Sequence, residues 1–325
     1  MKILIVYNPE AGRGCGIKHA EKLATAIRRL SKEAEVKMFS ATSLKIMREF
    51  WHRNSENPHG FKIVALIGGD GTIGPNVDAM IKNKVKIPVF AYGRGTANDF
   101  ASFFKTKMTA GRAARTILAR KTIEIDTIQI ENSNEETTYA VNVAGGGAFT
   151  NGVTTYKEKN KRLLGKYAYL LTSTMKILTL KSQLVCFTVS GVNGPGRIKT
   201  PASGEDEIAF EARVFLFYIL NTRNAGSLKN AANLADASDG YLDLVIVKRC
   251  GFFGKIGILY AKSLKRLHCC KHIAYIQGRR FRVDPVGGAI HDFTRTDLDG
   301  NPGTPYPLEV TVGPKIEIVI SPDIS

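Results

Sequence analysis

The sequence predicts an α/β fold of two domains, a doubly wound parallel sheet followed by an antiparallel β-sandwich. Up to about residue 121, buried-strand patterns alternate with helical patterns, which is typical of β-α-β units and a parallel sheet. Beyond that point β-branched and alternating runs dominate, which favours antiparallel strands. The 325 residues also exceed what one core usually spans. We therefore expect an α/β domain at 1–121 and a β-rich domain at 122–325, whose C-terminal tail is able to return to the first domain.

The first domain is expected to contain four strands, "KILIVYN" (2–8), "EVKMFS" (35–40), "KIVALIGGDGT" (62–72) and "KIPVFAYG" (86–93). Apolar residues at helical spacing place helices over 16–30, 43–53 and 76–84, and "TANDFASFF" (96–104) opens a further helical stretch. The carboxyl ends of parallel strands share one edge of the sheet. Ligands bind beyond that edge in folds of this kind.

The second domain is expected to be built from runs of β-branched or alternating residues bounded by Gly, Asn, Asp and Pro. These runs cover 122–131, 138–146, 182–191, 211–221, 240–249, 272–285, 308–313 and 315–321. Helical stretches interrupt them at about 161–180 and about 252–267. The short linker between the domains predicts a cleft between them.

Charge and cysteine content narrow the function. A formal charge of +17 favours an anionic partner, such as a phosphorylated molecule or an anionic membrane face. The single Trp51 and the dispersed aromatic residues form no stacking platform, so nucleic acid is not expected. Five cysteines without C-x-x-C spacing indicate a reducing compartment. No signal peptide or apolar span of sufficient length is evident, so we expect a cytoplasmic protein that associates peripherally with membranes.

Three glycine-rich loops follow predicted strands: "YNPEAGRG" (7–14), "LIGGDGTIG" (66–74) and "GRGTANDFA" (93–101). Glycines let the backbone turn sharply and bring N–H groups close to a polyphosphate. A carboxylate such as Asp70 beside phosphate calls for a cation or a transferring hydroxyl, and Arg94 is a candidate phosphate partner. The alternative is a tight strand-to-helix turn with an N-capping role for Thr72. Three such loops at one sheet edge favour the phosphate site, which is not of the Walker A type.

These motifs resemble the diacylglycerol kinase and sphingosine kinase superfamily, and in particular the bacterial soluble lipid kinases of the diacylglycerol kinase type. The resemblance rests on "NPEAG" (8–12), "GGDGT" (68–72) and "GTANDFA" (95–101), and continues through "NVAGGG" (142–147), "GKYAY" (165–169), "SDGYLD" (238–243) and "LDGNPG" (298–303). "GGDGT" alone is shared with NAD kinases, but the ordered set is specific. The resemblance implies an NAD kinase/diacylglycerol kinase-like fold, ATP as co-substrate and Mg²⁺.

The resemblance also implies a set of site residues. ATP phosphates would lie against Gly68, Gly69, Asp70, Gly71 and Thr72, with Asn8, Gly12, Arg13, Thr96 and Asn98 around them. Asp99 and Asp126 match positions that relatives use near a metal and the active site. A structural Mg²⁺ would sit at the acidic turn of Asp236, Asp239 and Tyr241. The alternative for that turn is a hairpin built on Asp-Gly.

The chain departs from the family at several positions. The family's D-G-E supplies a Glu as the base for the lipid hydroxyl, but here the residues are Asp299, Gly300 and Asn301. A neutral amide does not accept that proton, so Asp299 is the remaining candidate for the role. The other departures are Gly74-Pro75 after Ile73, Gly93 in place of Pro, and Ser102 in place of Arg. Because phosphoryl transfer depends mainly on positioning and charge, they need not abolish it.

We therefore expect an ATP- and Mg²⁺-dependent lipid kinase that phosphorylates the hydroxyl of diacylglycerol or a related lipid at an anionic membrane surface. A homodimer is allowed. One alternative is an NAD or polyol kinase of the same superfold, and another is a nucleotide- or lipid-binding regulator that has lost catalysis at Asn301. Zinc at "HCCKH" (268–272) is disfavoured, because adjacent helical cysteines diverge and no second cluster completes the ligands. For the amphipathic stretch 255–272, burial of the apolar side is favoured over membrane binding.

Overall fold

The computed structural model describes residues 1–95, 97–131, 136–147, 181–193, 206–225, 230–264, 266–288 and 293–322. The chain divides into two compact units. The first unit contains residues 1–127 and 314–325, and the second contains residues 128–313. Thr96, the motif at 165–169 and the helical stretch expected at 161–180 lie outside the described residues.

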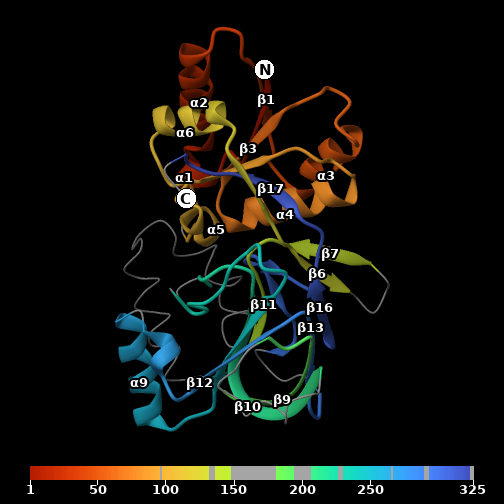
Figure 1. The fold of residues 1–325 in the computed structure, drawn as a ribbon, viewed down its shortest axis with the longest axis vertical. Helices are drawn as coiled ribbons and strands as arrows, with labels where there is room; N and C mark the ends of the chain where they lie inside the picture. The colour runs from red at the N-terminus through yellow and green to blue at the C-terminus, as the bar shows by residue number, and fades with distance from the viewer. Residues whose placement is uncertain are drawn as a thin grey trace. The chain divides into compact units, whose positions relative to one another are not determined.

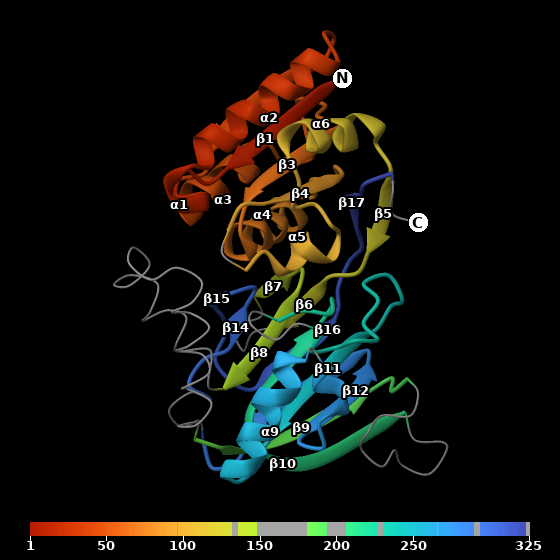
Figure 2. The same ribbon diagram turned by 90° about the vertical axis from the view of Figure 1, so that its left-hand side faces the viewer.

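The first unit is a six-stranded sheet with helices on both faces (Figures 1 and 2). Its strand order is β2-β1-β3-β4-β17-β5, and all neighbours are parallel except β17 and β5. The strands are β1 (Lys2–Tyr7), β2 (Glu35–Ser40), β3 (Ile63–Gly68), β4 (Val89–Gly93), β5 (Thr122–Ile125) and β17 (Ile316–Val319). The helices are α1 (Ala11–Gly14), α2 (Gly16–Leu30), α3 (Leu44–Arg53), α4 (Asp70–Lys82), α5 (Asp99–Phe103) and α6 (Ala110–Ala119).

The core of this unit explains the doubly wound arrangement. Helices α2 and α6 pack together on one face of the sheet, and α3 and α4 lie on the other (Figure 1). The central strands β1, β3 and β4 are buried on both faces, as continuous apolar runs in parallel sheets require. On the second face Trp51 of α3 is buried and donates to Asn76 Oδ1 of α4 at 2.8 Å, which ties the two helices together.

One strand expected in the second domain, β5, belongs to the first unit, as does β17 of the C-terminal tail, whose return to the first domain was allowed for. The run 122–131 breaks at Asp126-Thr127 into β5 and β6, and β5 pairs with β17 instead of with a strand of the β-rich domain. The hydroxyl of Thr127 donates to the carbonyl of Pro314 at 2.7 Å, at the point where both chain segments leave the first unit. The first unit therefore extends past the expected boundary at Lys121 and includes the C-terminal tail.

The second unit is an antiparallel sheet of eleven strands that curls around its own core. Its path is β15-β14-β8-β10-β9-β13-β16-β6-β7, with β11 and β12 added beside β10. The strands are β6 (Ile128–Glu131), β7 (Thr137–Ala140), β8 (Val143–Gly147), β9 (Gln183–Ser190), β10 (Glu207–Leu220), β11 (Leu242–Lys248), β12 (Ile273–Gly278), β13 (Arg280–Pro285), β14 (Asp297–Leu298), β15 (Asn301–Pro302) and β16 (Leu308–Val312).

Strand β10 produces the curl. Its first half pairs with β9, its second half pairs with β8 and β11, and a register shift between Val214 and Leu216 separates the halves. Phe187 and Phe217 pack edge to face inside the curl. Outside it, helix α9 (Phe252–Ser263) and the short 3₁₀ segment η1 (Leu267–Cys269) cover β11 and β12. Within the described residues, no helix combines the length and apolar character that a membrane span needs.

Candidate active site

The three glycine-rich loops meet at one edge of the first unit's sheet. They follow β1, β3 and β4, which are adjacent parallel strands. The backbone N–H of Arg94 donates to the carbonyl of Gly68 at 2.7 Å, and that of Asn8 donates to Ile67 at 3.2 Å. Backbone hydrogen bonds thus join each outer loop to the central one.

Contacts between glycines bring the loops closer than other residues would allow. A Cβ on Gly69 would lie 3.0 Å from the Cα of Gly95, and a Cβ on Gly95 would lie 3.0 Å from the backbone N of Gly69 and closer still to its Cα. A Cβ on Gly12 would lie 3.3 Å from the carbonyl of Arg94. Backbone therefore contacts backbone here, and the loops form a surface of main-chain groups that side chains would block.

Asp70 joins two of these loops through its carboxylate. It occupies the first position of α4, and its two oxygens accept the backbone N–H groups of Asp99 at 3.0 Å and Phe100 at 3.1 Å. Those N–H groups belong to the first turn of α5, which has no cap from its own N-cap residue, Asn98. Asp70 therefore caps α5 from 29 residues away along the chain.

Asn98 shapes the third loop. Its φ of 52° is left-handed, a conformation that Asn tolerates better than most residues. Its amide oxygen accepts the N–H of Gly95 at 2.5 Å, and its amide nitrogen donates to the carbonyl of Gly95 at 2.8 Å. Asn98 thus bonds to both polar backbone groups of Gly95. Thr96, which was expected at the phosphates, lies outside the described residues.

Arg94 is turned into the protein. Its guanidinium lies over the ring of Tyr92, with 3.9 Å between Cζ and the ring centroid. It donates to the Tyr92 hydroxyl, to the carbonyl of Gly93 at 3.2 Å and to the carbonyl of Met108 at 2.6 Å. Those contacts anchor the loop to the segment before α6. The role of Arg94 as a phosphate partner stays a prediction.

The charge of Arg94 acts on two neighbouring residues that the motifs had not indicated. Burial raises the pKa of the Tyr92 phenol, and the adjacent guanidinium partly offsets that rise. Burial lowers the pKa of His19, and Arg94 and Lys22 lower it further. His19 lies in the first turns of α2, and its Nε2 would be 3.1 Å from a Cβ on Gly12. His19, whose pKa is lowered, therefore borders the first loop, and no sequence motif marks it.

The first loop has its own constraints. Gly12 and Arg13 have φ values of 64° and 65°, so α1 is interrupted and two successive residues are left-handed. The Asn8 carboxamide oxygen accepts the N–H of Glu10 at 2.9 Å, and its nitrogen approaches the Thr72 hydroxyl at 3.5 Å. Arg13 is exposed. Asn8, Gly12 and Thr72 are therefore brought together, with Arg13 at the surface.

The two further acidic candidates of the first unit are buried. Asp99 is 2% exposed and Asp126 is 1% exposed. Among the residues that the structure describes, no three His, Cys, Asp or Glu side chains are close enough to hold a metal ion, either here or at 268–272. The metal role of Asp99 and Asp126 therefore stays a prediction.

The acidic turn of the second unit precedes β11. Asp236 accepts the backbone N–H of Ser238 at 3.1 Å, and Asp239 accepts that of Tyr241 at 2.9 Å, as Asx turns do. Asp239 also accepts the side-chain amide of Gln277 at 2.9 Å. Asp243 is buried behind the turn, where the hydroxyl of Tyr275 donates to it.

Two further carboxylates, those of Asp239 and Asp236, act on the pKa of Asp243. Burial raises its pKa to about 7; the hydrogen bond from Tyr275 lowers it, and the charges of Asp239 and Asp236 raise it. Burial and the same carboxylate raise the pKa of the Tyr275 phenol. Asp236, Asp239 and Asp243 repel one another electrostatically, but within the described part of the chain these three carboxylates do not come close enough together to hold a metal ion. The Mg²⁺ expected at this turn therefore stays a prediction.

Asp299 lies in the turn between β14 and β15, far in sequence from its partners. Its Oδ1 accepts the N–H groups of Asn142 and Val143, both at 2.9 Å, and its Oδ2 accepts that of Val141 at 2.8 Å. Its own N–H donates to the carbonyl of Val143 at 3.0 Å. With 2% exposure, this carboxylate fixes the hairpin to the start of β8. Its geometry is that of a positioning residue.

Asn301 is on the other side of that turn. Asp299 and Gly300 have φ values of 51° and 80°, as a two-residue type I′ hairpin requires. The Asn301 amide has only a long contact of 3.5 Å, to the carbonyl of Leu298, and its side chain is part-exposed. The side chain at the position where the resemblance implies the base is therefore a part-exposed amide.

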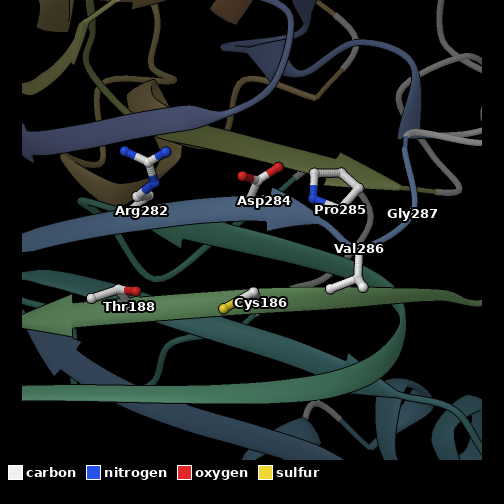
Figure 3. A pocket seen from close by; sticks show the side chains of 7 residues that line it. All are labelled: Cys186, Thr188, Arg282, Asp284, Pro285, Val286 and Gly287. Carbon is white, nitrogen blue, oxygen red and sulfur yellow. The ribbon is translucent and has the colours of Figure 1, made fainter.

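The open face of the β-rich sheet carries a shallow pocket of about 330 Å³ outside all the motifs (Figure 3). Cys186 and Thr188 of β9 and Arg282 and Asp284 of β13 line it, and Arg282 is held by Glu309 at 2.6 Å. Cys186 is a free thiol. Nothing in this pocket resembles the glycine-lined surface of the first unit.

Comparison with known proteins agrees with the motifs. Residues 2–130 match the family described as diacylglycerol kinase catalytic domain. A diacylglycerol kinase of Bacillus subtilis is 26% identical over 310 residues, which cover 94% of this chain and 91% of that protein. A protein of Escherichia fergusonii named probable lipid kinase YegS is 35% identical over 125 residues, covering 38% of this chain and 40% of that one.

The fold is shared with solved structures. A crystal structure of a diacylglycerol kinase from Bacillus anthracis has a TM-score of 0.70 with this chain, at 17% identity. The match covers 100% of this chain and 98% of that one. At this identity the likeness establishes the fold, which is the α/β unit with its curled antiparallel partner.

Proposed function

We propose that this chain, whose residues 2–130 match the diacylglycerol kinase catalytic domain family, is a lipid kinase that transfers the γ-phosphoryl group of ATP to the free hydroxyl of diacylglycerol or a related lipid. The observation that carries the proposal is the surface formed by the three loops after β1, β3 and β4. Its glycines let backbone lie directly against backbone at the carboxyl edge of a parallel sheet, where polyphosphates bind.

The residues present fit ATP. Gly12, Gly69 and Gly95 sit where a Cβ would fill the space between the loops. We propose that Gly68, Gly69, Gly71 and Thr72 hold the phosphates, with Asn8, Arg13 and Thr96 beside them. Asp70 and Asn98 contribute by holding the third loop, because their side-chain atoms are engaged by its backbone.

Mg²⁺ has two proposed places. The carboxylates of Asp236 and Asp239, with the backbone at Tyr241, would hold a structural ion that neutralises the acidic turn around Asp243. A second ion would accompany the nucleotide near Asp99 and Asp126. When bound, Mg²⁺ spreads and neutralises the charge that develops on a transferred phosphoryl group.

Neither candidate for the base that would accept the proton of the lipid hydroxyl is well suited to that role in this chain. Asn301 does not take a proton, and Asp299 is occupied by three backbone N–H groups. We propose that transfer depends on positioning and charge, with a correspondingly modest rate. The charge of +17 would concentrate the enzyme at the anionic membrane surface where its acceptor resides.

The amide at Asn301 also supports a second candidate function, a nucleotide- and lipid-binding regulator without turnover. Labelled ATP with a panel of lipid acceptors distinguishes the two. The kinase proposal predicts label in a diacylglycerol-type lipid and a faster reaction for Asn301→Glu. Nucleotide binding without transfer to any lipid, in both proteins, would favour the regulator. Transfer of the labelled phosphoryl group to NAD or to a polyol, and not to a lipid, would show that the proposed lipid acceptor is wrong.

A further inference from the structure

Among the residues that the structure describes, helix α9 packs against the second unit along one side. Ile258 is buried against the outer face of the sheet, in a cluster with Phe215 and Leu267. The ammonium of Lys255 lies 4.9 Å from the centroid of the Phe215 ring, on the same side. The contacts of this side hold the helix against the sheet.

The opposite side of α9 exposes large apolar side chains. Phe253 is 86% exposed, Tyr260 66% and Phe252 61%. At 100° per residue these three fall, with Ile256 and Leu264, within an arc of about 120°. The five residues are called the apolar face of α9. For the stretch 255–272 we expected the apolar side to be buried; the structure buries Ile258 and Leu267 but leaves Ile256, Tyr260 and Leu264 exposed.

A groove runs beside this face. It has a volume of about 430 Å³ and lies between Gly257 and Ala261 of α9 and the segment that carries Arg266, Cys269 and Lys271. Arg266 and Lys271 are exposed at its border. The small residues of α9 therefore open a space whose lining is largely apolar and whose rim is basic.

The charge of the chain segment that contains α9 has one sign. Between Leu244 and Val283 the sequence contains ten Lys and Arg residues and neither Asp nor Glu. Exposed aromatic residues next to clustered basic residues are the combination found where a helix lies in the interface of an anionic membrane. A second copy of this chain would bring the same positive charge against itself, which disfavours self-association through this face.

We propose that the apolar face of α9 docks on an anionic phospholipid bilayer. Phe252, Phe253 and Tyr260 enter the interfacial region, while Arg266 and Lys271 meet lipid phosphates. This inference rests on the proposed function, since it identifies the surface by which a lipid kinase reaches an acceptor that resides in the bilayer. It concerns binding alone and adds no chemical step.

Vesicle co-sedimentation tests the proposal with matched variants. The double variant Phe253→Ser/Tyr260→Ser should lose binding to phosphatidylglycerol-containing vesicles, and Arg266→Gln/Lys271→Gln should bind about tenfold or more weakly, since each well-placed cation is worth about 1 kcal/mol. Leu44→Ser/Ile46→Ser and Lys32→Gln/Lys45→Gln are the controls, because their side chains are also exposed but lie in the first unit. Equal loss in control and test pairs would overturn the proposal. The proposal would also be overturned if light scattering showed that wild type is a dimer and that Phe253→Ser/Tyr260→Ser is a monomer, because the apolar face would then be a dimer interface.

A fluorescence probe reports the contact itself. Trp51 is buried, so a Trp introduced by Phe253→Trp would be the exposed indole. Brominated lipids should quench it and leave Trp51 unaffected, and an unquenched probe on bound protein would overturn the assignment. Phosphorylation of a short-chain diacylglycerol dispersed as monomers separates this proposal from the proposed function. Variants of the apolar face should still phosphorylate this monomeric lipid. If wild type does not phosphorylate it either, the result contradicts the proposed kinase function and leaves the docking surface to the vesicle experiments.

Discussion

The carboxylate of Asp70 caps the helix that begins at Asp99. It accepts the backbone N–H groups of Asp99 and Phe100 at 3.0 and 3.1 Å, so the second glycine loop holds the third in place. The sequence placed Asp70 in the loop as a partner for a cation at the terminal phosphate. The structure adds a mechanical role, since loss of the cap would release α5 and the loop that Asn98 closes.

Asp70→Ala is therefore expected to lower both stability and nucleotide affinity. Loss of a capping carboxylate should cost about 1–2 kcal/mol of unfolding free energy, measured by urea denaturation. Asp70→Asn keeps one acceptor oxygen and should lose less. Ser43→Ala removes the N-cap of α3, which accepts from Ile46 N at 3.2 Å, outside the three loops. It should lower stability similarly without weakening binding of a fluorescent ATP analogue. If both variants weaken binding equally, the effect of Asp70 is one of global stability.

Gly95→Ala tests the close approach of the second and third loops. The new Cβ would collide with the backbone of Gly69, which cannot rotate away as a side chain would. We expect a loss of about 1–3 kcal/mol in stability together with weaker nucleotide binding. Gly111→Ala is the matched control, because its Cβ would have no neighbour within 4 Å. Calorimetric titration with ATP measures the binding, and wild-type affinity in Gly95→Ala would argue against phosphate contact at these loops.

The buried carboxyl of Asp243 makes stability depend on pH. Burial raises its pKa from 3.8 to about 7, so the folded chain holds this proton more tightly than the unfolded chain. Its contribution to stability is complete below about pH 4 and is lost as the pH rises through about 7. Asp243→Asn removes the ionisation. With a chelator present, the unfolding free energy of wild type should therefore fall relative to that of the variant as the pH rises from 5 to 8. The change in the difference should be on the order of a few kcal/mol at most.

The charge of Asp239 provides a check on that result. It raises the pKa of Asp243, so Asp239→Asn should move the wild-type decrease in stability to lower pH. Added Mg²⁺ should act in the same direction if the ion binds this turn. A difference between wild type and Asp243→Asn that is constant across this pH range would contradict the assignment.

The sequence predicted the fold well where local pattern and burial agree. The apolar period of 16–30 matches α2, and the continuous apolar run at 63–68 matches β3. It failed where pairing is decided at long range. Nothing in "TIEI" indicates that β5 pairs with β17 near the other end of the chain. Helix α4 begins at Asp70 instead of Asn76, although Gly74 and Pro75 disfavour a helix, because packing of Ile73 and Val77 overrides that propensity.

In the candidate site, too, features set by local pattern were predictable and features set by long-range contacts were not. Glycine patterns and strand ends predicted where the loops meet, because the edge of a parallel sheet is fixed by topology. The partners of polar side chains were not predictable. Asp70 binds backbone 29 residues away and Asp299 binds backbone 157 residues away, so a motif that contains either residue does not reveal what it holds. His19 and Tyr92 were missed because no motif contains them.

Asp299→Asn separates a positioning role from a proton-accepting role. The native carboxylate accepts three N–H groups, and an amide in its place would direct a donor at one of them. Leaving that buried donor unpaired should cost about 1–3 kcal/mol of unfolding free energy. Asn301→Ala breaks only a long contact and should change stability by less than about 0.5 kcal/mol.

The rate per folded molecule then decides the role of Asp299. If it positions the hairpin, Asp299→Asn should lose stability while the folded fraction keeps the pH profile of wild type. If it accepts the hydroxyl proton, the rate should fall by about two orders of magnitude or more at unchanged stability, because a general base contributes about that much. Lipid phosphorylation measured across pH, with the folded fraction determined by circular dichroism, gives both quantities. We expect the first result, because the lone pairs of this carboxylate are directed at the backbone of residues 141–143.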